Sequence, residues 1–389
     1  MLKKVLLKGP ILSHSGYGVH CRQVFKALAR RKDIDLYIQA VSWGTTSWLL
    51  NDKNLNEEIK EILRCAAKDK RNINFDETFQ VCLPNEWEII GNKNIGITAG
   101  FEASFVKKSW IEKCNEMSYV IVPSEFTKNA FIKTSKDFNL NIRTKIYVIN
   151  EAYPEYFSQT KETSNSLSDQ LAYDKNILIM GQISSFDDLA DRKNTFKTIK
   201  SAINFVEDKN IGIVLKINAG NYSKFFKEKI LQVIKDRFNK YERRKLNIIF
   251  QCLDLENLRN LYECNKISCF YSGTRGEGWG LSFLESAYFG IPIIATDYSA
   301  YKEYLGNNFV KIPFDHVPVG VENNLFIDNK LKKPTWAEFS YDEAIKSLNN
   351  FFNNEEENTN KAARLQKIIK QNYNFDTINK KYCSFFEKI

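Results

Sequence analysis

The sequence predicts an α/β protein of two Rossmann-like domains, each built on a parallel sheet, that face one another across a cleft. Short apolar runs alternate with segments of helical periodicity, a polar stretch interrupts this alternation near the middle, and the alternation then restarts. A length of 389 residues also favours two cores over one. Parallel strands bring their carboxyl ends to one edge of each sheet, where folds of this class bind ligands.

The first half shows the rhythm of a parallel sheet covered on both faces. It opens with the apolar run KVLLKG (4–9), and a helix is predicted over 16–31 because apolar residues recur there near helical spacing. Further strands, with helices between them, are predicted at 35–41, 78–84, 94–99, 119–124 and 145–150. These elements make up a first domain over 1–157.

A polar stretch, SQTKETSNSLSDQLAY (158–173), has no apolar periodicity and is predicted to be a linker. The second domain, 174–370, has predicted strands at 176–182, 211–220, 246–251, 267–272 and 291–297. The remaining residues, 371–389, have an amphipathic pattern and predict a C-terminal helix that could pack back on the first domain.

Composition excludes several classes of protein. The chain is 43% hydrophobic and has no apolar run near the ~18 residues of a membrane span, so neither a disordered nor a membrane-spanning protein is expected. Eight scattered cysteines without a C-x-x-C pair, and three histidines, give no pattern for a disulfide framework or a zinc site. We therefore predict a cytoplasmic protein without a metal, with the inner face of the membrane as an alternative location. The net charge of +9 favours anions in general, whether nucleotides, lipid headgroups or nucleic acid.

The segment GTRGEGWGLSFLESAYFGIPIIATD (273–297) carries the strongest functional signal. A helix is predicted from about Gly280 to Gly290, and the glycine turn before it exposes the backbone N–H groups of Gly280, Leu281 and Ser282 to a phosphate. Glu285, one turn into the helix, suits the two hydroxyls of a ribose, and Glu277 suits sugar hydroxyls on the other side of the phosphate. The segment therefore predicts a nucleotide-sugar site; the alternative is an ordinary turn with two solvated glutamates.

The same segment resembles the signature of family 4 of the glycosyltransferases, which are retaining enzymes of the GT-B fold. DRKNTFKTIKSAINF (191–205) resembles the helix start whose lysine binds the donor phosphates, which implies this role for Lys193 with Arg192 beside it. LDLENLRNLYECNKISCFYS (253–272) resembles the segment that holds the base, from Leu253 onward. SHSGYGVHCRQVFKAL (13–28) resembles the N-terminal glycine loop, which implies donor contacts for Gly16 and Gly18.

Two departures from the family pattern concern the reacting centre. Many members have an arginine after the glycine that ends the first strand of the second domain, and here that position is Gln182, which can donate hydrogen bonds but carries no charge. Many also have a histidine beside the reacting sugar, where this chain offers Glu102. Glu277 and Glu102 are accordingly the catalytic candidates.

The acceptor is expected on the first domain, near His14, His20 and Arg22. Each histidine could equally be a residue without a functional role, and the Gly16–Gly18 turn a plain tight turn. The basic run KALARRK (26–32) is expected to be a solvated helix end, with contact to a membrane surface or to nucleic acid as the alternative.

These observations predict a retaining, metal-independent glycosyltransferase without a cofactor. Its co-substrate would be a nucleotide diphosphate sugar, with UDP as the commonest nucleotide. Its acceptor would be a glycan, a lipid-linked sugar or another hydroxyl. No Asp-x-Asp stands at a strand end to hold a metal. The alternatives are sugar transfer to modified DNA, a nucleotide-sugar epimerase or glycan phosphorylase on the same fold, and a non-catalytic nucleotide- or glycan-binding module.

Overall fold

The computed structural model divides the chain into two compact units. It describes residues 2–44, 46–50, 56–100, 102–159, 169–182, 188, 190–218, 223–320 and 333–389. Unit 1 comprises the described residues of 1–152 and 375–389, and unit 2 those of 153–325 and 332–374. Most of the predicted linker, 160–168, lies outside the described residues. No helix among the described residues is long and apolar enough to cross a membrane.

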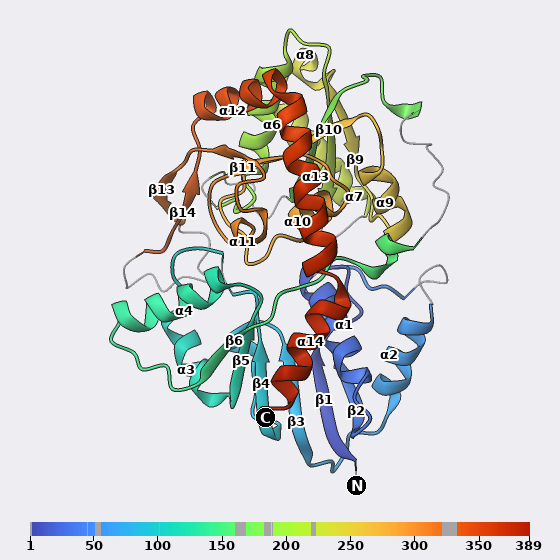
Figure 1. Cartoon of the computed structure of the whole chain (residues 1–389), viewed down its shortest axis with the longest axis vertical. Coiled ribbons are helices and arrows are strands. Elements are labelled where there is room, and N and C mark those ends of the chain that lie inside the picture. The colour runs from blue at the N-terminus through green and yellow to red at the C-terminus, as the bar shows by residue number, and fades with distance from the viewer. Residues whose placement is uncertain are drawn as a thin grey trace. The chain divides into compact units, whose positions relative to one another are not determined.

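Unit 1 is built on a six-stranded parallel sheet with strand order β2-β1-β3-β4-β5-β6. The strands are β1 (Lys3–Gly9), β2 (Ile34–Ala40), β3 (Phe75–Val81), β4 (Gly91–Ile97), β5 (Tyr119–Val122) and β6 (Lys145–Val148). The helices of this unit are α1 (Gly16–Ala29), α2 (Glu57–Ala67), α3 (Lys108–Glu116), α4 (Glu125–Asp137) and α14 (Phe375–Phe386). Figure 1 shows α3 and α4 on one side of the sheet and α1 and α14 on the other.

The start of α1 is set by a serine cap and a close backbone approach. The Ser15 hydroxyl accepts a hydrogen bond from the Gly18 N–H at 3.0 Å, which satisfies one of the N–H groups left open at a helix start. A Cβ on Gly18 would lie 2.2 Å from the Ser13 carbonyl oxygen, so a side chain at this position would push the turn away from the helix. The turn that follows β1 therefore requires glycine at position 18.

The C-terminal helix α14 packs beside α1 through a buried polar cluster. His20 of α1 is 2% exposed, with its Nδ1 3.6 Å from Glu151 Oε1 and its Nε2 3.4 Å from the Tyr382 hydroxyl of α14. Burial lowers the pKa of His20 to about 4 and raises the pKa of Glu151 to about 8. Both groups are thus driven toward their neutral forms, and the carboxyl keeps its proton at neutral pH.

Unit 2 is built on a second six-stranded parallel sheet, with strand order β12-β11-β10-β7-β8-β9. Its strands are β7 (Asn176–Gln182), β8 (Gly212–Asn218), β9 (Leu246–Ile249), β10 (Ile267–Ser272), β11 (Ile293–Thr296) and β12 (Val310–Ile312). Taken from β9, this is the Rossmann order 3-2-1-4-5-6, and the chain reverses direction across the sheet between β7 and β10. Ligand sites of such sheets lie at this switch point, beyond the carboxyl ends of the strands.

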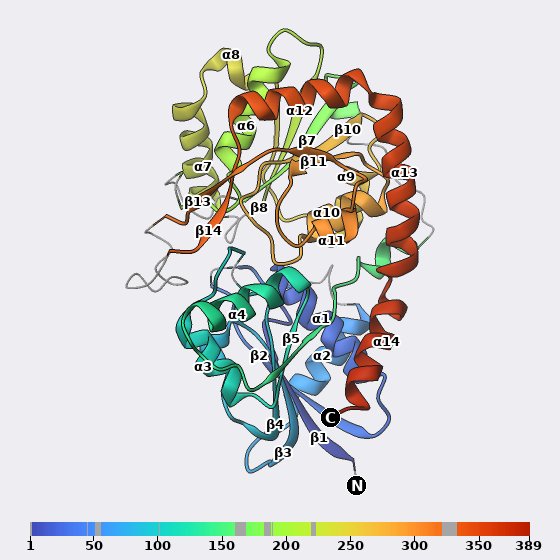
Figure 2. The same ribbon diagram turned by 60° about the vertical axis from the view of Figure 1, so that its left-hand side comes forward.

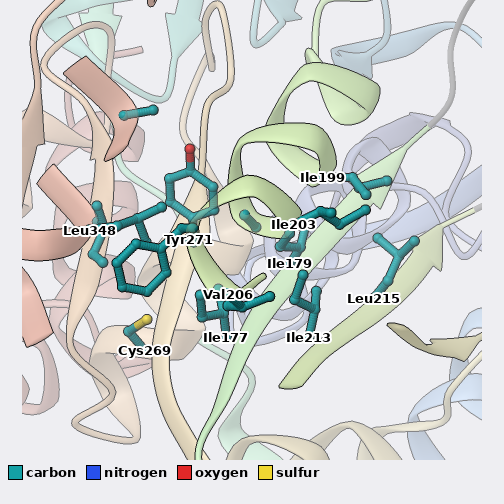
Figure 3. Packing of buried hydrophobic residues seen from close by; sticks show 14 of the residues in the cluster. Ile177, Ile179, Ile199, Ile203, Val206, Ile213, Leu215, Cys269, Tyr271 and Leu348 are labelled. Carbon is teal, nitrogen blue, oxygen red and sulfur yellow. The ribbon is translucent and has the colours of Figure 1, made fainter. Parts of the chain in front are cut away.

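Helices cover both faces of the second sheet and enclose two apolar clusters (Figure 2). The first cluster involves α6 (Thr195–Val206), α7 (Lys224–Arg237) and α12 (Tyr341–Asn353), and Figure 3 shows Ile199, Ile203 and Val206 of α6 against Ile177, Ile213 and Leu215 of the sheet. The second involves α9 (Leu255–Tyr262), α10 (Leu281–Tyr288), α11 (Lys302–Leu305) and α13 (Glu355–Asn372). The short helix α8 (Lys240–Arg243) precedes β9. Alternate residues of β7 and β8 point into the two clusters, as the pleat requires.

An antiparallel hairpin, absent from the sequence prediction, follows the second sheet. Strands β13 (Asp315–Pro318) and β14 (Thr335–Glu338) pair so that Asp315 lies opposite Glu338. The strands are four residues long, and the residues 321–332 between them lie outside the described part of the chain. Two four-residue runs of mixed polarity give too little periodicity to indicate a strand.

The buried pair in unit 1 predicts a pH dependence of stability that depends on Glu151. Because its pKa is raised to about 8 from an ordinary 4.5, the folded protein holds this proton more tightly than the unfolded chain. The stability that the protonated Glu151 carboxyl contributes is fully present below its pKa in the unfolded chain, and it is lost as pH rises through its pKa in the folded protein. From about pH 5 to about pH 8, the free energy of unfolding of the wild type should therefore fall by a few kcal/mol relative to Glu151→Gln.

Urea denaturation of both proteins across this pH range measures the difference. Glu125→Gln removes an exposed carboxylate from α4 of the same unit and controls for loss of surface charge. A difference between wild type and Glu151→Gln that does not change with pH would contradict the raised pKa.

Candidate functional site

The glycine-rich loop 273–280 follows β10 directly, at the switch point of the unit 2 sheet. The loop is almost fully buried, and three of its polar residues, Thr274, Arg275 and Glu277, are at most 6% exposed. Buried charges require partners. The partners come from the start of α6, from the loop after β11 and from the β13–β14 hairpin.

Glu277 is the point at which these segments meet. Its carboxylate accepts hydrogen bonds from Lys193 Nζ at 2.6 and 2.7 Å, from Thr274 Oγ1 at 3.0 Å and from Arg192 at 3.3 Å. Its backbone N–H donates to Ser299 Oγ at 3.0 Å. Burial would raise the pKa of Glu277, but the charges of Lys193 and Arg192 outweigh burial and hold it below its usual value. Glu277 therefore stays ionised and holds both cations at the start of α6 beside the loop.

A second ion-pair cluster supports the loop from the side of the hairpin. Arg275 donates through Nε to Glu338 Oε2 at 2.7 Å, and its guanidinium lies 5.1 Å from the centre of the Trp336 ring. Arg275 also donates to the Asp191 carbonyl oxygen at 2.9 Å. Glu338 in turn accepts from Lys197 at 2.5 Å and from Asn194 at 3.2 Å. The hairpin therefore ties the loop to the residues that precede and begin α6.

The helix α10 starts at the end of this loop, as the sequence predicted. Gly280 caps it with a φ of +90°, a left-handed conformation that glycine adopts without strain. The Gly280 carbonyl oxygen accepts a hydrogen bond from the Tyr304 hydroxyl at 2.7 Å, which fixes the turn. Leu281 and Ser282 form the first turn of α10, where the N–H groups have no partner within the helix. Gly290 follows the helix with a φ of +74°.

Glu285 lies within α10 in an environment unlike that of Glu277. It is 9% exposed, and its Oε2 accepts a hydrogen bond from the Tyr262 hydroxyl of α9 at 2.9 Å. Burial raises the pKa of Glu285 to about 7, although Tyr262 and the charge of Lys216 act to lower it. One motif thus holds two carboxylates whose pKa values are displaced in opposite directions, a pattern common at functional sites.

The remaining donor-side candidates lie at the carboxyl edge of the same sheet. Gln182 ends β7, and its backbone N–H and carbonyl oxygen both hydrogen-bond to the Thr195 hydroxyl of α6, at 3.2 and 3.0 Å. Leu253 lies between β9 and α9 and is partly buried among the residues of the second cluster. The residues that follow Gln182, 183–187, lie outside the described part of the chain.

In unit 1, the candidate residues gather around the turn between β1 and α1. Arg22 donates to the carbonyl oxygens of Ile11 and Ser13 at 2.7 and 2.9 Å, so its guanidinium supports this turn. Gly16 is exposed, and His14 is partly exposed. Glu102 is partly buried and lies within electrostatic range of the Tyr17 hydroxyl.

Tyr17 lies among the candidate residues of unit 1 and was absent from the sequence prediction. Its hydroxyl shares a hydrogen bond with Thr98 Oγ1 at 2.8 Å and accepts one from the Ala99 N–H at 3.1 Å, so it joins the glycine turn to the end of β4. Its ring stacks on Trp43 with 4.2 Å between ring centres. A tyrosine between the two glycines of the turn was the available signal.

One expectation for unit 1 changes. His20 was grouped with the acceptor-side residues, but its ring is enclosed between α1, Glu151 and α14 and has no surface from which to contact an acceptor. The basic run 26–32 lies at the end of α1, with Arg30 and Lys32 exposed as expected of a solvated helix end. Lys26, Arg30 and Arg31 are paired with Glu58, Asp376 and Glu77, at 3.1, 2.8 and 2.7 Å.

Within the described residues, no group of three or more His, Cys, Asp and Glu side chains is placed to hold a metal ion. A hollow of about 820 Å³ lies at the amino ends of β10 and β11, lined by residues such as Lys175, Arg259 and Gln366. Sheets of this kind bind ligands at the opposite, carboxyl edge, so the motif and not this hollow is the candidate site.

Comparison with known proteins places the motif in a family. Residues 182–317 match the family model of glycosyl transferases group 1. No curated protein matches the chain significantly. The chain therefore carries a glycosyl transferases group 1 domain, and the predicted enzyme class, glycosyl transfer, is confirmed.

Solved structures confirm the GT-B fold. HepE from Anabaena, in complex with UDP and glucose, is 12% identical, with 100% of each chain covered and a TM-score of 0.63. A glycosyltransferase from Rickettsia africae is 12% identical, with 100% of this chain and 98% of that chain covered and a TM-score of 0.63. Sucrose-phosphate synthase from Thermosynechococcus elongatus is 11% identical, with 99% and 98% covered and a TM-score of 0.64.

The Glu338 cluster predicts that a residue outside the motif stabilises it. Glu338→Gln should lower the free energy of unfolding by about 1–3 kcal/mol, because Arg275 and Lys197 would lose their carboxylate partner. Glu343→Gln, which breaks an exposed pair with Lys346 three residues away, should cost much less. Urea denaturation measures both variants, and equal effects would contradict a supporting role for Glu338.

Proposed function

We propose that this chain transfers a sugar from a nucleotide diphosphate sugar to an acceptor hydroxyl, with retention of the anomeric configuration and without a metal ion. The observation that carries the proposal is the pairing of Lys193 and Arg192 with the single carboxylate of Glu277, beside the start of α10. A sugar transferase must stabilise a leaving diphosphate, and positive charge fixed in place before the reaction does so without reorganisation.

The diphosphate would bind between the cations and the first turn of α10. Lys193 and Arg192 are 22% and 20% exposed at their side chains, so both can reach a ligand while they remain anchored to Glu277. The N–H groups of Gly280, Leu281 and Ser282 and the positive end of the helix would hold the same phosphates. Gln182 would add neutral donors where many relatives place an arginine.

The nucleoside would lie along α10 toward Glu285 and Leu253. A carboxylate one turn into the helix can accept both ribose hydroxyls, and Leu253 lies in the segment that would face the base. UDP is the nucleotide we favour, because HepE, a structure of the same fold, was solved with UDP-glucose. Glu277 would orient the transferred sugar.

The acceptor side is assigned to unit 1. The Gly16–Gly18 turn and Glu102 would face the reacting sugar, and His14 would lie at the acceptor, a glycan, a lipid-linked sugar or another hydroxyl. We propose acceptor attack on the face from which the diphosphate departs, which retains the configuration without a covalent intermediate. Proton NMR of the new anomeric centre reads the stereochemistry directly.

A nucleic-acid acceptor is less well supported than a small hydroxyl acceptor. Binding to DNA draws on clustered cations that are available for phosphates. The basic run at the end of α1, the best candidate for such a cluster, has three of its cations in ion pairs with Glu58, Glu77 and Asp376.

Substitution of Lys193 tests the phosphate assignment. UDP-glucose should raise the melting temperature of the wild type, since a ligand at 100 times its Kd stabilises by about 2.7 kcal/mol. Lys193→Met should abolish most of this shift. It should also lower the unliganded melting temperature, because Glu277 would lose its main counter-charge. Thermal denaturation with and without ligand measures both effects.

Two further variants separate binding from folding. Adding Glu277→Gln to Lys193→Met should recover part of the unliganded stability, since the buried carboxylate is then no longer charged, but not the ligand shift. Lys200→Met removes another cation of α6, paired with Glu242, and should keep the shift. A full shift in Lys193→Met would place the phosphates elsewhere.

A chelator tests metal independence. Consumption of UDP-glucose in the presence of an acceptor extract should continue in EDTA, because the diphosphate charge would be met by Lys193, Arg192 and the helix start. The assay is release of UDP, followed enzymatically after removal of the chelator. Loss of activity in EDTA and its recovery with Mn²⁺ or Mg²⁺ would overturn this part of the proposal.

A further inference from the structure

Two buried residues of unit 2 have a backbone conformation that side chains rarely adopt. Among the residues that the structure describes, four other than glycine have a positive φ: Asn72, Asn139, Asn194 and Ser299, at 58°, 51°, 52° and 76°. Asn72 and Asn139 lie on exposed turns of unit 1, where asparagine tolerates this conformation. Asn194 and Ser299 are only 3% and 6% exposed. The two buried cases therefore need an explanation of their own.

Both of them lie beside the ion pair of Lys193 and Glu277. Asn194 directly follows Lys193, and its amide nitrogen donates to Glu338 Oε1 at 3.2 Å. Ser299 lies between β11 and α11, and its Oγ accepts a hydrogen bond from the Glu277 N–H at 3.0 Å. Backbone strain that the surrounding structure sustains tends to gather at functional sites. Ser299 is the stronger case, because serine tolerates a positive φ less well than asparagine does.

The turn that carries Ser299 holds the backbone of Glu277 on both sides. Ser299 Oγ accepts from the Glu277 N–H, and the Ala300 N–H donates to the Glu277 carbonyl oxygen at 3.3 Å. The last residue of β11, Thr296, donates through Oγ1 to the Thr274 carbonyl oxygen at 2.6 Å. The end of β11 and the turn after it therefore fix the glycine-rich loop at positions 274 and 277.

The turn is itself fixed by buried neighbours. Tyr301, which precedes α11, is fully buried, and its hydroxyl donates to the Thr296 carbonyl oxygen at 2.6 Å. Its ring stacks on Phe283 of α10 with 4.0 Å between ring centres, and Figure 2 shows α10 and α11 side by side. The Lys302 N–H donates to the Ser299 carbonyl oxygen at 3.3 Å. Ser299 cannot move away from Glu277 without disturbing this packing.

The side chain at position 299 is explained by its hydroxyl and not by the backbone. Glycine adopts a positive φ without strain, but it has no side-chain oxygen to accept the Glu277 N–H. Alanine would keep the strain and would also lose the acceptor. A buried N–H without an acceptor costs free energy, so the hydroxyl compensates for the strain that serine brings to this position.

We infer that Ser299 is a positioning residue, whose hydroxyl fixes Glu277 so that the Glu277 carboxylate can orient the transferred sugar. This inference rests on the proposed function of Glu277. Lys193 and Arg192 hold the carboxylate, and Ser299 and Ala300 hold the backbone, so both ends of the residue are in place before a substrate binds. Small displacements at a reacting centre slow the chemical step strongly, so the loss of the hydroxyl should lower kcat more than donor affinity.

The variants Ser299→Gly and Ser299→Ala separate the hydroxyl from the backbone strain. Both remove the acceptor, but only glycine relieves the positive φ, so Ser299→Gly should have the higher melting temperature of the two. Release of UDP from UDP-glucose, with an acceptor extract present, measures kcat and the KM for the donor. Both variants should lower kcat on the order of tenfold and leave this KM nearly unchanged. Activity that follows stability, with Ser299→Gly near wild type, would overturn the inference.

A conservative variant and a matched control complete the kinetic test. Ser299→Asn should recover part of the lost kcat, because asparagine tolerates a positive φ and its side-chain oxygen can accept an N–H as serine does. Asn139→Gly relieves a φ of 51° on an exposed turn of unit 1 and should leave kcat unchanged. A loss of kcat in Asn139→Gly as large as that in Ser299→Gly would contradict a specific role for Ser299.

Amide hydrogen exchange tests the same contact without a substrate. In protein that carries nitrogen-15 in its glutamate residues, the Glu277 amide signal is assigned by its loss in Glu277→Gln. This amide should exchange on the order of tenfold faster in both Ser299→Gly and Ser299→Ala than in wild type, because it loses its acceptor in both. Unchanged exchange in both variants would overturn the inference. If wild type releases no UDP from UDP-glucose, the proposed function is wrong, whereas the exchange rates still decide whether Ser299 holds Glu277.

Discussion

The carboxylate of Glu277 holds the glycine-rich loop 273–280 together. Lys193 and Arg192 reach it from 84 and 85 residues away along the chain, Thr274 from the same loop, and Ser299 accepts a hydrogen bond from its backbone. A buried carboxylate is costly unless it is fully paired, so the start of α6, the glycine loop and the segment after β11 have to converge on it. The same convergence presents two cations beside the first turn of α10. The interaction that organises this region therefore also places the two cations that we propose for the diphosphate.

Much of unit 2 and its motif could be predicted because the signals are local. The glycines before α10, the apolar runs of the strands and Gly290 after the helix each act within a few residues, and the structure places α10 over Leu281–Tyr288 between them. The partners of the motif could not be predicted in this way. Glu338 and Tyr262 reach it from other elements, and nothing within a few residues of either one marks the contact. An arginine in a buried glycine loop does require a distant carboxylate, and Arg275 was that signal.

His20 shows the opposite kind of error, in which a local signal was present but was given too little weight. His20, Val24 and Ala27 lie at i, i+4 and i+7 on α1, a spacing that defines the buried face of a helix. That spacing predicts a histidine in the core, and it needs no functional residue. Its chemistry is instead that of a neutral imidazole packed against α14. Helical periodicity therefore constrains the position of a side chain more strongly than the nearness of a glycine loop does.

The two glutamates of the motif illustrate how environment assigns roles to identical side chains. Glu277 has two cations within hydrogen-bond distance and its pKa is held low, so it stays ionised and serves as an anchor. Glu285 accepts a hydrogen bond from the Tyr262 phenol, but burial outweighs it and raises the pKa of Glu285 to about 7, so its ionisation depends on its surroundings. A carboxylate that is already saturated by partners has little capacity left for a hydroxyl ligand, whereas one that is poorly compensated gains from each new donor. In the function that we propose, a ribose would therefore be bound better by Glu285 than by Glu277, and a diphosphate would be bound by the cations around Glu277.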